Sequence, residues 1–320
     1  MDSLTRMRPA EAQQLRELGN AWESYGPALR DKLALDGGMT WKQVNCADYL
    51  CRYRQDPETG KKRFTSLGRR SRETEATYRD FIGQRDAARQ TVLDSRADIA
   101  LAGRVAKAHG LARMPVKSAE IVRAFWRRKL DEHLTLAGGS ALFAYELGSE
   151  ILGPAELLRE DSLMFVTAGP LQSDLLDDVA DAIRETSGGK MRVSPAEDHV
   201  SFQCGDAMEV ELVSPEFFLG RADNDEQDEV LQEAFRMPRI KGVTVARDAQ
   251  PVEITAFDPR AYALLAYVTG MDDETRMERA HFAATMVREC WPDKFDPRQE
   301  EAFPEVCLDP AEAGMRYGGP

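Results

Sequence analysis

The hydrophobic positions of the first 130 residues predict helices around one β-hairpin. Apolar side chains such as Leu15, Leu18 and Trp22 recur every three or four positions, which is the repeat of an amphipathic helix. Around Tyr49 apolar and polar residues alternate instead, and a turn containing proline and glycine follows, as between two antiparallel strands. The predicted elements are helices over 8–35, 73–108 and 116–129 and a hairpin within 41–64. Residues 1–130 are therefore predicted to form a mainly helical region.

After residue 131 the pattern changes to short apolar runs separated by glycine turns and helical segments, which predicts buried strands. The predicted strands are 134–137, 162–167, 199–203, 208–213 and 242–245, and the predicted helices are 140–147, 171–185, 260–269 and 274–289. The expected fold class is α+β. A core with a mixed sheet over 131–250 stands between the helical region 1–130 and a C-terminal region 251–320, which consists of helices and a loose tail.

The composition is typical of a globular protein, with 42% hydrophobic and 30% charged residues. No apolar run reaches the roughly 18 residues of a membrane span, and the N-terminus lacks the apolar core of a secretion signal. We therefore expect a cytoplasmic protein that does not bind membranes. The five cysteines are too scattered for a zinc site, so free thiols are expected.

The formal net charge of −13 disfavours non-specific binding to nucleic acid, but the charge is unevenly distributed. Basic residues cluster from 52 to 72, whereas residues 216–233 are strongly acidic. The basic cluster is either solvated surface or a phosphate-binding region. Under the second interpretation Arg69 and Arg70 bind a nucleotide, because guanidinium groups match phosphate oxygens. A protein that binds nucleic acid through this basic half is a third class of function.

A glycine turn and three acidic residues supply the candidate chemistry. The turn lies between a predicted strand and a predicted helix, where backbone N–H groups without a nearby Cβ can approach a phosphate. The acidic residues lie on later strands, and a spacing of two places side chains on one face of a strand. Carboxylates gathered from adjacent strands are ligands for Mg²⁺. The candidate site residues are Gly138, Gly139, Ser140, Asp161, Glu209 and Glu211.

These motifs resemble a bacterial family of nucleotidyltransferase-fold proteins in the DNA polymerase β-like superfamily. The resemblance spans residues 26–289 and is carried by Trp41, Ser66-Leu-Gly68, Gly138-Gly-Ser-Ala-Leu-Phe-Ala-Tyr145, Glu160-Asp161, Val210-Glu-Leu-Val-Ser-Pro215 and Asp258-Pro-Arg-Ala-Tyr-Ala263. It implies transfer of a nucleoside monophosphate from a nucleoside triphosphate to an unknown acceptor, which is a protein, an RNA or a small molecule. Asp161 and Glu211 are then the Mg²⁺ ligands, with Glu209 assisting catalysis, and the glycine turn holds the phosphates.

The chain departs from the family pattern at one expected carboxylate. The Asp-x-Asp pair falls on Asp161 and Leu163, and the lysine expected within 264–267 is missing. Whether the protein is an enzyme is therefore left open. The alternative is a degenerate relative that senses nucleotides or regulates a protein partner, as in a toxin–antitoxin pair. If Leu163 marks an eroded metal site, Leu163→Asp should strengthen Mg²⁺ binding. A homodimer through helix 73–108 is also compatible with the sequence.

Overall fold

A computed structural model describes residues 4–55, 61–158, 162–189, 191–196, 198–204, 208–270, 273–294, 297–303 and 306. The chain forms two compact units. Unit 1 consists of Met1–Leu18 and Gly103–Pro320, and unit 2 consists of Gly19–Ala102. The predicted boundaries near 130 and 250 do not separate compact units, because the residues on both sides of each belong to unit 1.

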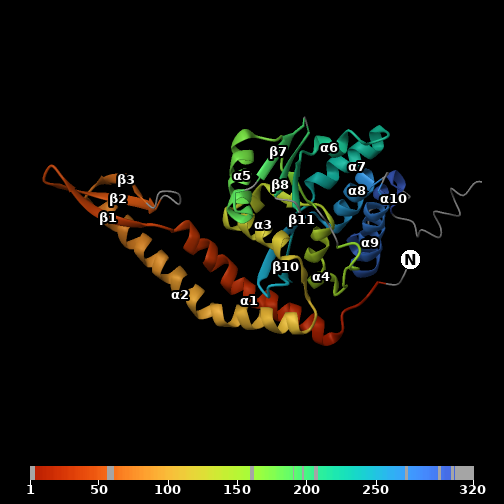
Figure 1. The fold of residues 1–320 in the computed structure, drawn as a ribbon, viewed down its shortest axis with the longest axis horizontal. Coiled ribbons are helices and arrows are strands. Elements are labelled where there is room, and N and C mark those ends of the chain that lie inside the picture. Colours follow the sequence, from red (N-terminus) through yellow and green to blue (C-terminus); the bar gives the residue numbers. More distant parts are fainter. Residues whose placement is uncertain are drawn as a thin grey trace, which may run out of the picture. The chain divides into compact units, whose positions relative to one another are not determined.

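Unit 2 contains a three-stranded antiparallel sheet and parts of two long helices (Figure 1). The elements are α1 (Pro9–Ala34), β1 (Gly38–Val44), β2 (Ala47–Gln55), β3 (Lys62–Arg69) and α2 (Arg72–Ala108). The two helices agree with their predictions, but the predicted hairpin is one strand short. Strand β1 turns into β2 at Asn45 and Cys46, whose φ angles of 49° and 62° are those of a tight hairpin turn. A cysteine at the second turn position hides this signal.

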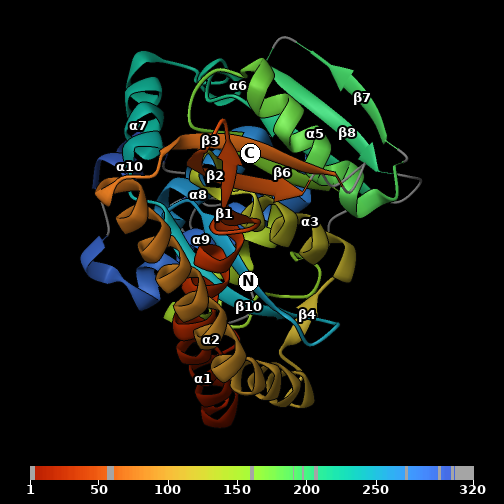
Figure 2. The ribbon, with the colours of Figure 1, turned by 90° about the vertical axis from the view of Figure 1, so that its left-hand side faces the viewer.

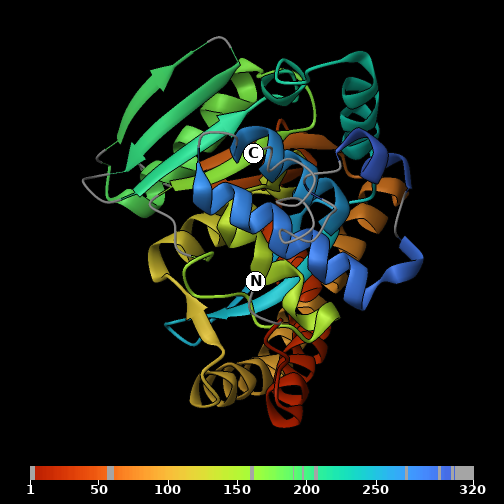
Figure 3. The ribbon, with the colours of Figure 1, turned by 90° about the vertical axis from the view of Figure 1, so that its right-hand side faces the viewer.

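Unit 1 is built on a mixed eight-stranded sheet (Figures 2 and 3). The strand order is β4-β10-β11-β5-β6-β9-β8-β7, and the pairs β4–β10, β5–β11 and β6–β9 are parallel. The strands are β4 (Ala112–Met114), β5 (Leu134–Leu136), β6 (Ser162–Thr167), β7 (Met191–Pro195), β8 (His199–Cys204), β9 (Met208–Val213), β10 (Ile240–Ala246) and β11 (Pro251–Ala256). A mixed sheet with helices confirms the predicted α+β class.

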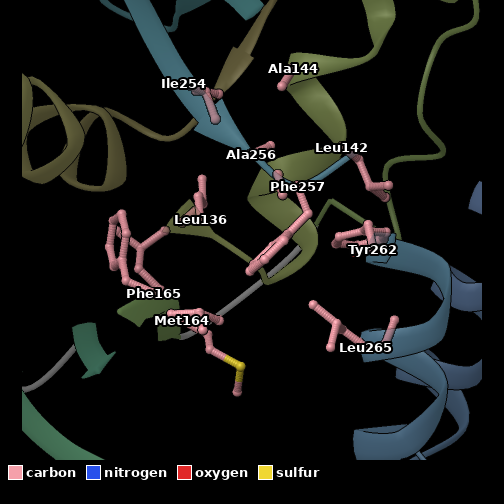
Figure 4. Packing of buried hydrophobic residues seen from close by; sticks show 14 of the residues in the cluster. Leu136, Leu142, Ala144, Met164, Phe165, Ile254, Ala256, Phe257, Tyr262 and Leu265 are labelled. Atoms are coloured by element: carbon pink, nitrogen blue, oxygen red, sulfur yellow. The ribbon is translucent and has the colours of Figure 1, made fainter. Parts of the chain in front are cut away.

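Helices pack on both faces of this sheet. They are α3 (Val116–Arg127), η1 (Leu130–Glu132), η2 (Gly139–Ala144), α4 (Glu146–Ser149), α5 (Ser173–Ser187), α6 (Glu216–Leu219), α7 (Asp225–Arg236), α8 (Pro259–Gly270), α9 (Glu274–Cys290), η3 (Pro292–Lys294) and α10 (Pro297–Ala302). On one face Phe125 of α3 stacks on Phe165 of β6, with ring centroids 4.9 Å apart. Figure 4 shows Tyr262 and Leu265 of α8 beside Phe257, away from Leu136 and Phe165.

The predicted strands at 134–137, 162–167, 199–203, 208–213 and 242–245 and the predicted helices 171–185, 260–269 and 274–289 are confirmed with small boundary shifts. Strands β4, β7 and β11 and helices α6 and α7 were not predicted. The predicted helix 140–147 is wrong in type, because η2 is a six-residue 3-10 helix. The predicted loose tail is wrong for its first part, because the ring of Phe303 packs 5.9 Å from that of Tyr267. None of the described helices is both long and apolar enough to cross a membrane.

Candidate functional site

A pocket of about 350 Å³ opens in unit 1 where β6 and β9 face α8 and α9. Its walls combine hydroxyl, carboxylate and guanidinium groups with small apolar residues. The lining residues are Ala137, Gly138, Ser162, Met164, Glu209, Tyr262, Ala266, Thr269, Asp273, Thr275, Arg276 and Arg279. Two predicted site residues from distant parts of the sequence, Gly138 and Glu209, therefore line one pocket. We call it the β6–α9 pocket.

The glycine turn is held by close backbone packing. Gly138 follows β5 and lines the pocket, and the Tyr262 hydroxyl donates to its carbonyl at 3.3 Å. Behind it, a Cβ on Gly139 would stand 2.4 Å from the Leu157 carbonyl oxygen and 2.8 Å from Arg279 Nε. Such distances are shorter than any normal contact, so only glycine fits at position 139 without movement of its neighbours.

Gly139 and Ser140 are buried beneath the pocket wall, and Ser140 is only 2% exposed. The predicted α-helix would have aimed its positive end at a phosphate, but the 3-10 helix η2 is too short to carry the dipole of a long helix. Of the three turn residues predicted to bind phosphate, Gly138 is the one that lines the pocket. The roles of the other two stay predictions.

The acidic residues are placed by the pairing of β6 with β9. Ser162 stands opposite Glu209 and Met164 opposite Glu211, and paired residues point to the same face. Ser162, Met164 and Glu209 line the pocket, while Glu211 lies one pair farther along the same face and is half-buried. Glu209 and Glu211 therefore share one face of β9, as their spacing predicts. Asp161 lies outside the described residues.

The structure corrects the interpretation of Leu163. Leu163 alternates with Ser162 and Met164 along β6, so it points to the opposite face from the pocket. It is fully buried, on the face where Phe165 packs against Phe125 of α3. The positions of β6 that face the pocket are therefore 162 and 164. Ser162, and not Leu163, is therefore the residue of β6 that stands opposite Glu209.

Two arginines that the sequence analysis did not select line the pocket from α9. Arg276 Nη1 donates to the Thr269 carbonyl at 3.3 Å, and its Nε lies 3.4 Å from Asp273 Oδ2. Arg279 Nε donates to the Leu157 carbonyl at 2.8 Å, which holds a buried guanidinium behind the glycine turn. Their spacing of three on a predicted helix, directly after an Asp that caps it, was the available signal.

A tyrosine pair supports the floor of the pocket. The rings of Tyr145 and Tyr262 meet edge to face at 5.8 Å, and the Tyr145 hydroxyl donates to the Phe257 carbonyl at 2.9 Å. Burial raises the pKa of Tyr145 well above its usual value, so this hydroxyl stays a neutral donor. Tyr262, which Figure 4 shows on α8, is thereby fixed where it can hold the Gly138 carbonyl.

Mg²⁺ is the ion that the family resemblance implies, so we tested the residues of the pocket against its needs. Glu209 and Ser162 supply one carboxylate and one hydroxyl, while Asp273 is engaged as the cap of α9 and as a partner of Arg276. In the part of the chain that the structure describes, no three His, Cys, Asp or Glu side chains are grouped to hold a metal. These residues do not fit a two-metal site, which needs several carboxylates at one point.

Two of the residues predicted to bind a nucleotide are arginines of the other compact unit. Arg69 and Arg70 belong to unit 2, where Arg70 is bound by Asp48 at 3.3 Å and Glu75 at 2.8 Å. Their predicted contact with a nucleotide stays a prediction. In unit 1, Arg123 donates two hydrogen bonds to the carboxylate of Asp248, at 2.8 and 2.9 Å.

Comparison of the chain with models of protein families, with curated proteins and with solved structures found no match.

Proposed function

We propose that the protein is a nucleotidyltransferase-fold protein that binds a nucleoside triphosphate in the β6–α9 pocket. The observation that carries this proposal is the meeting of Gly138, Glu209 and Arg276 on one hollow, although they come from three separate segments of the chain. A volume of about 350 Å³ is at the lower end of small-molecule pockets, so the pocket suits part of a nucleotide with the remainder in solvent.

The chemistry of the walls supports a phosphate ligand. A guanidinium has five N–H donors, and the contacts of Arg276 with Thr269 and Asp273 leave some of them for a phosphate. Arg276 is also partly exposed, with 31% of its side chain accessible, so a ligand can reach it without unfolding the helix. The hydroxyls of Ser162 and Thr275 line the same hollow and add neutral donors.

Binding without transfer is the better-supported use of the pocket. Transfer needs carboxylates aimed at one metal cluster, and the pocket face of β6 offers Ser162 and Met164 instead. We infer that the protein acts as a nucleotide-responsive regulator, in which Glu209 repels or orients the phosphates according to whether a cation accompanies them.

Nucleotidyl transfer is the second candidate. It is favoured by the shared face of Glu209 and Glu211, which is the spacing that a metal-binding strand requires. In that case one of these carboxylates would accept the proton of the attacking hydroxyl.

The two candidates are separated by one experiment on the full chain. ATP, GTP, CTP and UTP are titrated with and without Mg²⁺ by calorimetry, and transfer of an α-³²P label to protein, RNA and water is followed in parallel. Binding of at least one triphosphate without label transfer is expected. Label transfer that Glu211→Ala abolishes would establish the enzyme instead.

Arg276→Ala should weaken triphosphate binding about tenfold, because a charge-assisted hydrogen bond to phosphate is removed. Arg288→Ala is the matched control, since Arg288 is an exposed arginine farther along the same helix and does not line the pocket. Equal affinities of the two variants would show that the nucleotide binds elsewhere.

A further inference from the structure

The small sheet of unit 2 has two unlike faces. On one face Trp41 of β1 packs on Tyr78 of α2, with ring centroids 6.1 Å apart, and Arg52 of β2 lies over the ring of Phe81 of α2 at 5.5 Å. Leu50, the partner of Trp41 in the ladder, is fully buried. This face is therefore occupied by the helix that belongs to the same unit.

The pairing register assigns a different set of side chains to the other face. Tyr53 stands opposite Phe64, Lys42 opposite Tyr49, and Tyr49 opposite Arg69. Because Tyr53 and Lys62 alternate with Arg52 and Arg63 along their strands, they point away from α2. We call this set the aromatic–basic face. It consists of Lys42, Tyr49, Tyr53, Lys62, Phe64 and Arg69.

Four side chains of this face contact one another, and those on β3 are exposed, whereas those on β1 and β2 are partly buried. The rings of Tyr53 and Phe64 lie 5.6 Å apart, Lys42 Nζ stands 3.1 Å from the Phe64 centroid, and Lys62 Nζ stands 4.6 Å from that of Tyr53. Phe64 is 42% exposed, and every residue of β3 except Gly68 is exposed. The rings of Tyr53 and Phe64 thus lie beside two ammonium groups on a partly exposed face of the sheet.

We propose that the aromatic–basic face is a docking surface for single-stranded nucleic acid. Unpaired bases of any sequence stack on aromatic rings. The phosphates that join the bases need cations at short intervals. The face supplies both chemistries across three strands. A duplex does not expose its base faces, so the rings favour a single strand over a double one.

Charge supports this partner despite the net charge of −13 for the whole chain. Charges farther away than the Debye length, about 8 Å at physiological ionic strength, are screened, so the local charge decides the encounter. Within the described residues of the three strands Asp48 is the single acidic residue, and it is paired with Arg70.

The internal cation–π contacts do not prevent stacking. Such contacts are weak at exposed positions, whereas stacking of a base on an aromatic ring is stronger. An arriving base can therefore displace the ammonium group of Lys42 from Phe64, and that group then pairs with the flanking phosphate. An acidic peptide could pair with the cations of this face but has no bases to stack on its rings. The contribution of the aromatic ring therefore distinguishes a nucleic acid from an acidic peptide.

The test uses fluorescence anisotropy of the full chain with labelled oligo(U), oligo(A) and oligo(dT) of about 20 nucleotides, which exceeds the site size of one small stacking domain. The salt concentration is varied for each probe. Lys42→Ala/Lys62→Ala should raise the dissociation constant about tenfold and flatten its salt dependence. Phe64→Leu, which keeps an apolar side chain but removes the ring, should weaken binding severalfold. Phe64→Tyr should restore it.

The matched control is Arg54→Ala/Arg63→Ala, which removes the same charge from the opposite face of the same sheet. It should leave binding within about twofold of wild type. Equal losses in the two double variants, equal affinity for a duplex of the same length, or competition by oligoglutamate as strong as by oligo(U) would each overturn the proposal. The wild-type chain could instead self-associate without binding nucleic acid. If Lys42→Ala/Lys62→Ala abolishes that self-association, the face binds an acidic surface of a second copy.

Discussion

At the scale of single residues, the structure distinguishes arginines that bind within the chain from arginines that can bind a ligand. Arg123 donates to both oxygens of Asp248, to the Gln250 carbonyl at 2.9 Å and to the Pro251 carbonyl at 3.0 Å, so its role is to fasten α3 to the β10–β11 turn. Arg276 makes a longer hydrogen bond within the chain and lines a pocket. Sequence cannot make this distinction, since both are arginines on helices and their partners come from distant segments.

The Arg123–Asp248 pair should make the free energy of unfolding decrease in acid. Burial raises the pKa of Asp248, but the hydrogen bonds from Arg123 and from the Gln250 N–H outweigh it, so its pKa lies below the usual value. A carboxylate whose pKa is lowered in the folded chain stabilises the fold fully at pH values above its pKa in the unfolded chain, near 3.9. This contribution is lost as the pH falls through the pKa of the folded chain. Asp248→Asn should cost roughly 1–3 kcal/mol at pH 7.

Urea unfolding at pH 7 and pH 3 measures this cost. The difference between Asp248→Asn and wild type should shrink at the lower pH, because Asp248 takes up a proton more readily in the unfolded chain than in the folded one. Asp177→Asn, at an exposed position of α5, should behave as wild type at both values. A difference that is the same at pH 7 and pH 3 would mean that the charge of Asp248 does not stabilise the fold.

At the scale of elements, a strand register decides which residues belong to the site. Sequence located β6 to the residue, and the pairing of β6 with β9 shows that 162 and 164 face the pocket while 163 faces α3. A shift of one residue exchanges the two faces of a strand, and a strand buried on both faces has no polar alternation to reveal its register. The sequence could therefore not show that Leu163 points towards α3.

This register gives a paired prediction. Ser162→Asp adds a carboxylate opposite Glu209 and should increase the affinity for Mg²⁺ by about tenfold, because a second anion joins the first. Leu163→Asp buries an unpaired carboxylate in the core and should destabilise unit 1 by several kcal/mol without creating a metal site. Calorimetric Mg²⁺ titration and thermal melting report the two effects. Tighter Mg²⁺ binding by a folded Leu163→Asp protein would refute the register.

At the scale of the whole molecule, the chain has two separate compact units joined by continuous helices. Along the sequence, residues 19–102 form one unit, and the residues before and after them form the other. The hydrophobic cluster of unit 1 consists of residues from 114–306. The candidate pocket lies in unit 1 and the aromatic–basic face in unit 2, so the two proposals can fail independently.

Separate cores predict separate responses to a core substitution. Leu212→Ala removes a fully buried side chain of β9 and should cost unit 1 about 2–5 kcal/mol. Hydrogen exchange followed by mass spectrometry should then show faster exchange throughout β6, β8 and β9, with exchange in β1 and β2 unchanged. Equal acceleration in both units would show that the chain unfolds as one cooperative body.

The sequence by itself determined the fold class, most helices and the central strands, because these depend on local periodicity and on glycine turns. It also selected Gly138 and Glu209, which the structure brings to one pocket. The tertiary structure decided what depends on contacts between distant segments: the side of β6 that faces the pocket, the arginines of α9 that line it, and the three strands that compose the aromatic–basic face. Such contacts leave no periodic trace in a sequence, since either partner alone is an ordinary residue of its own element.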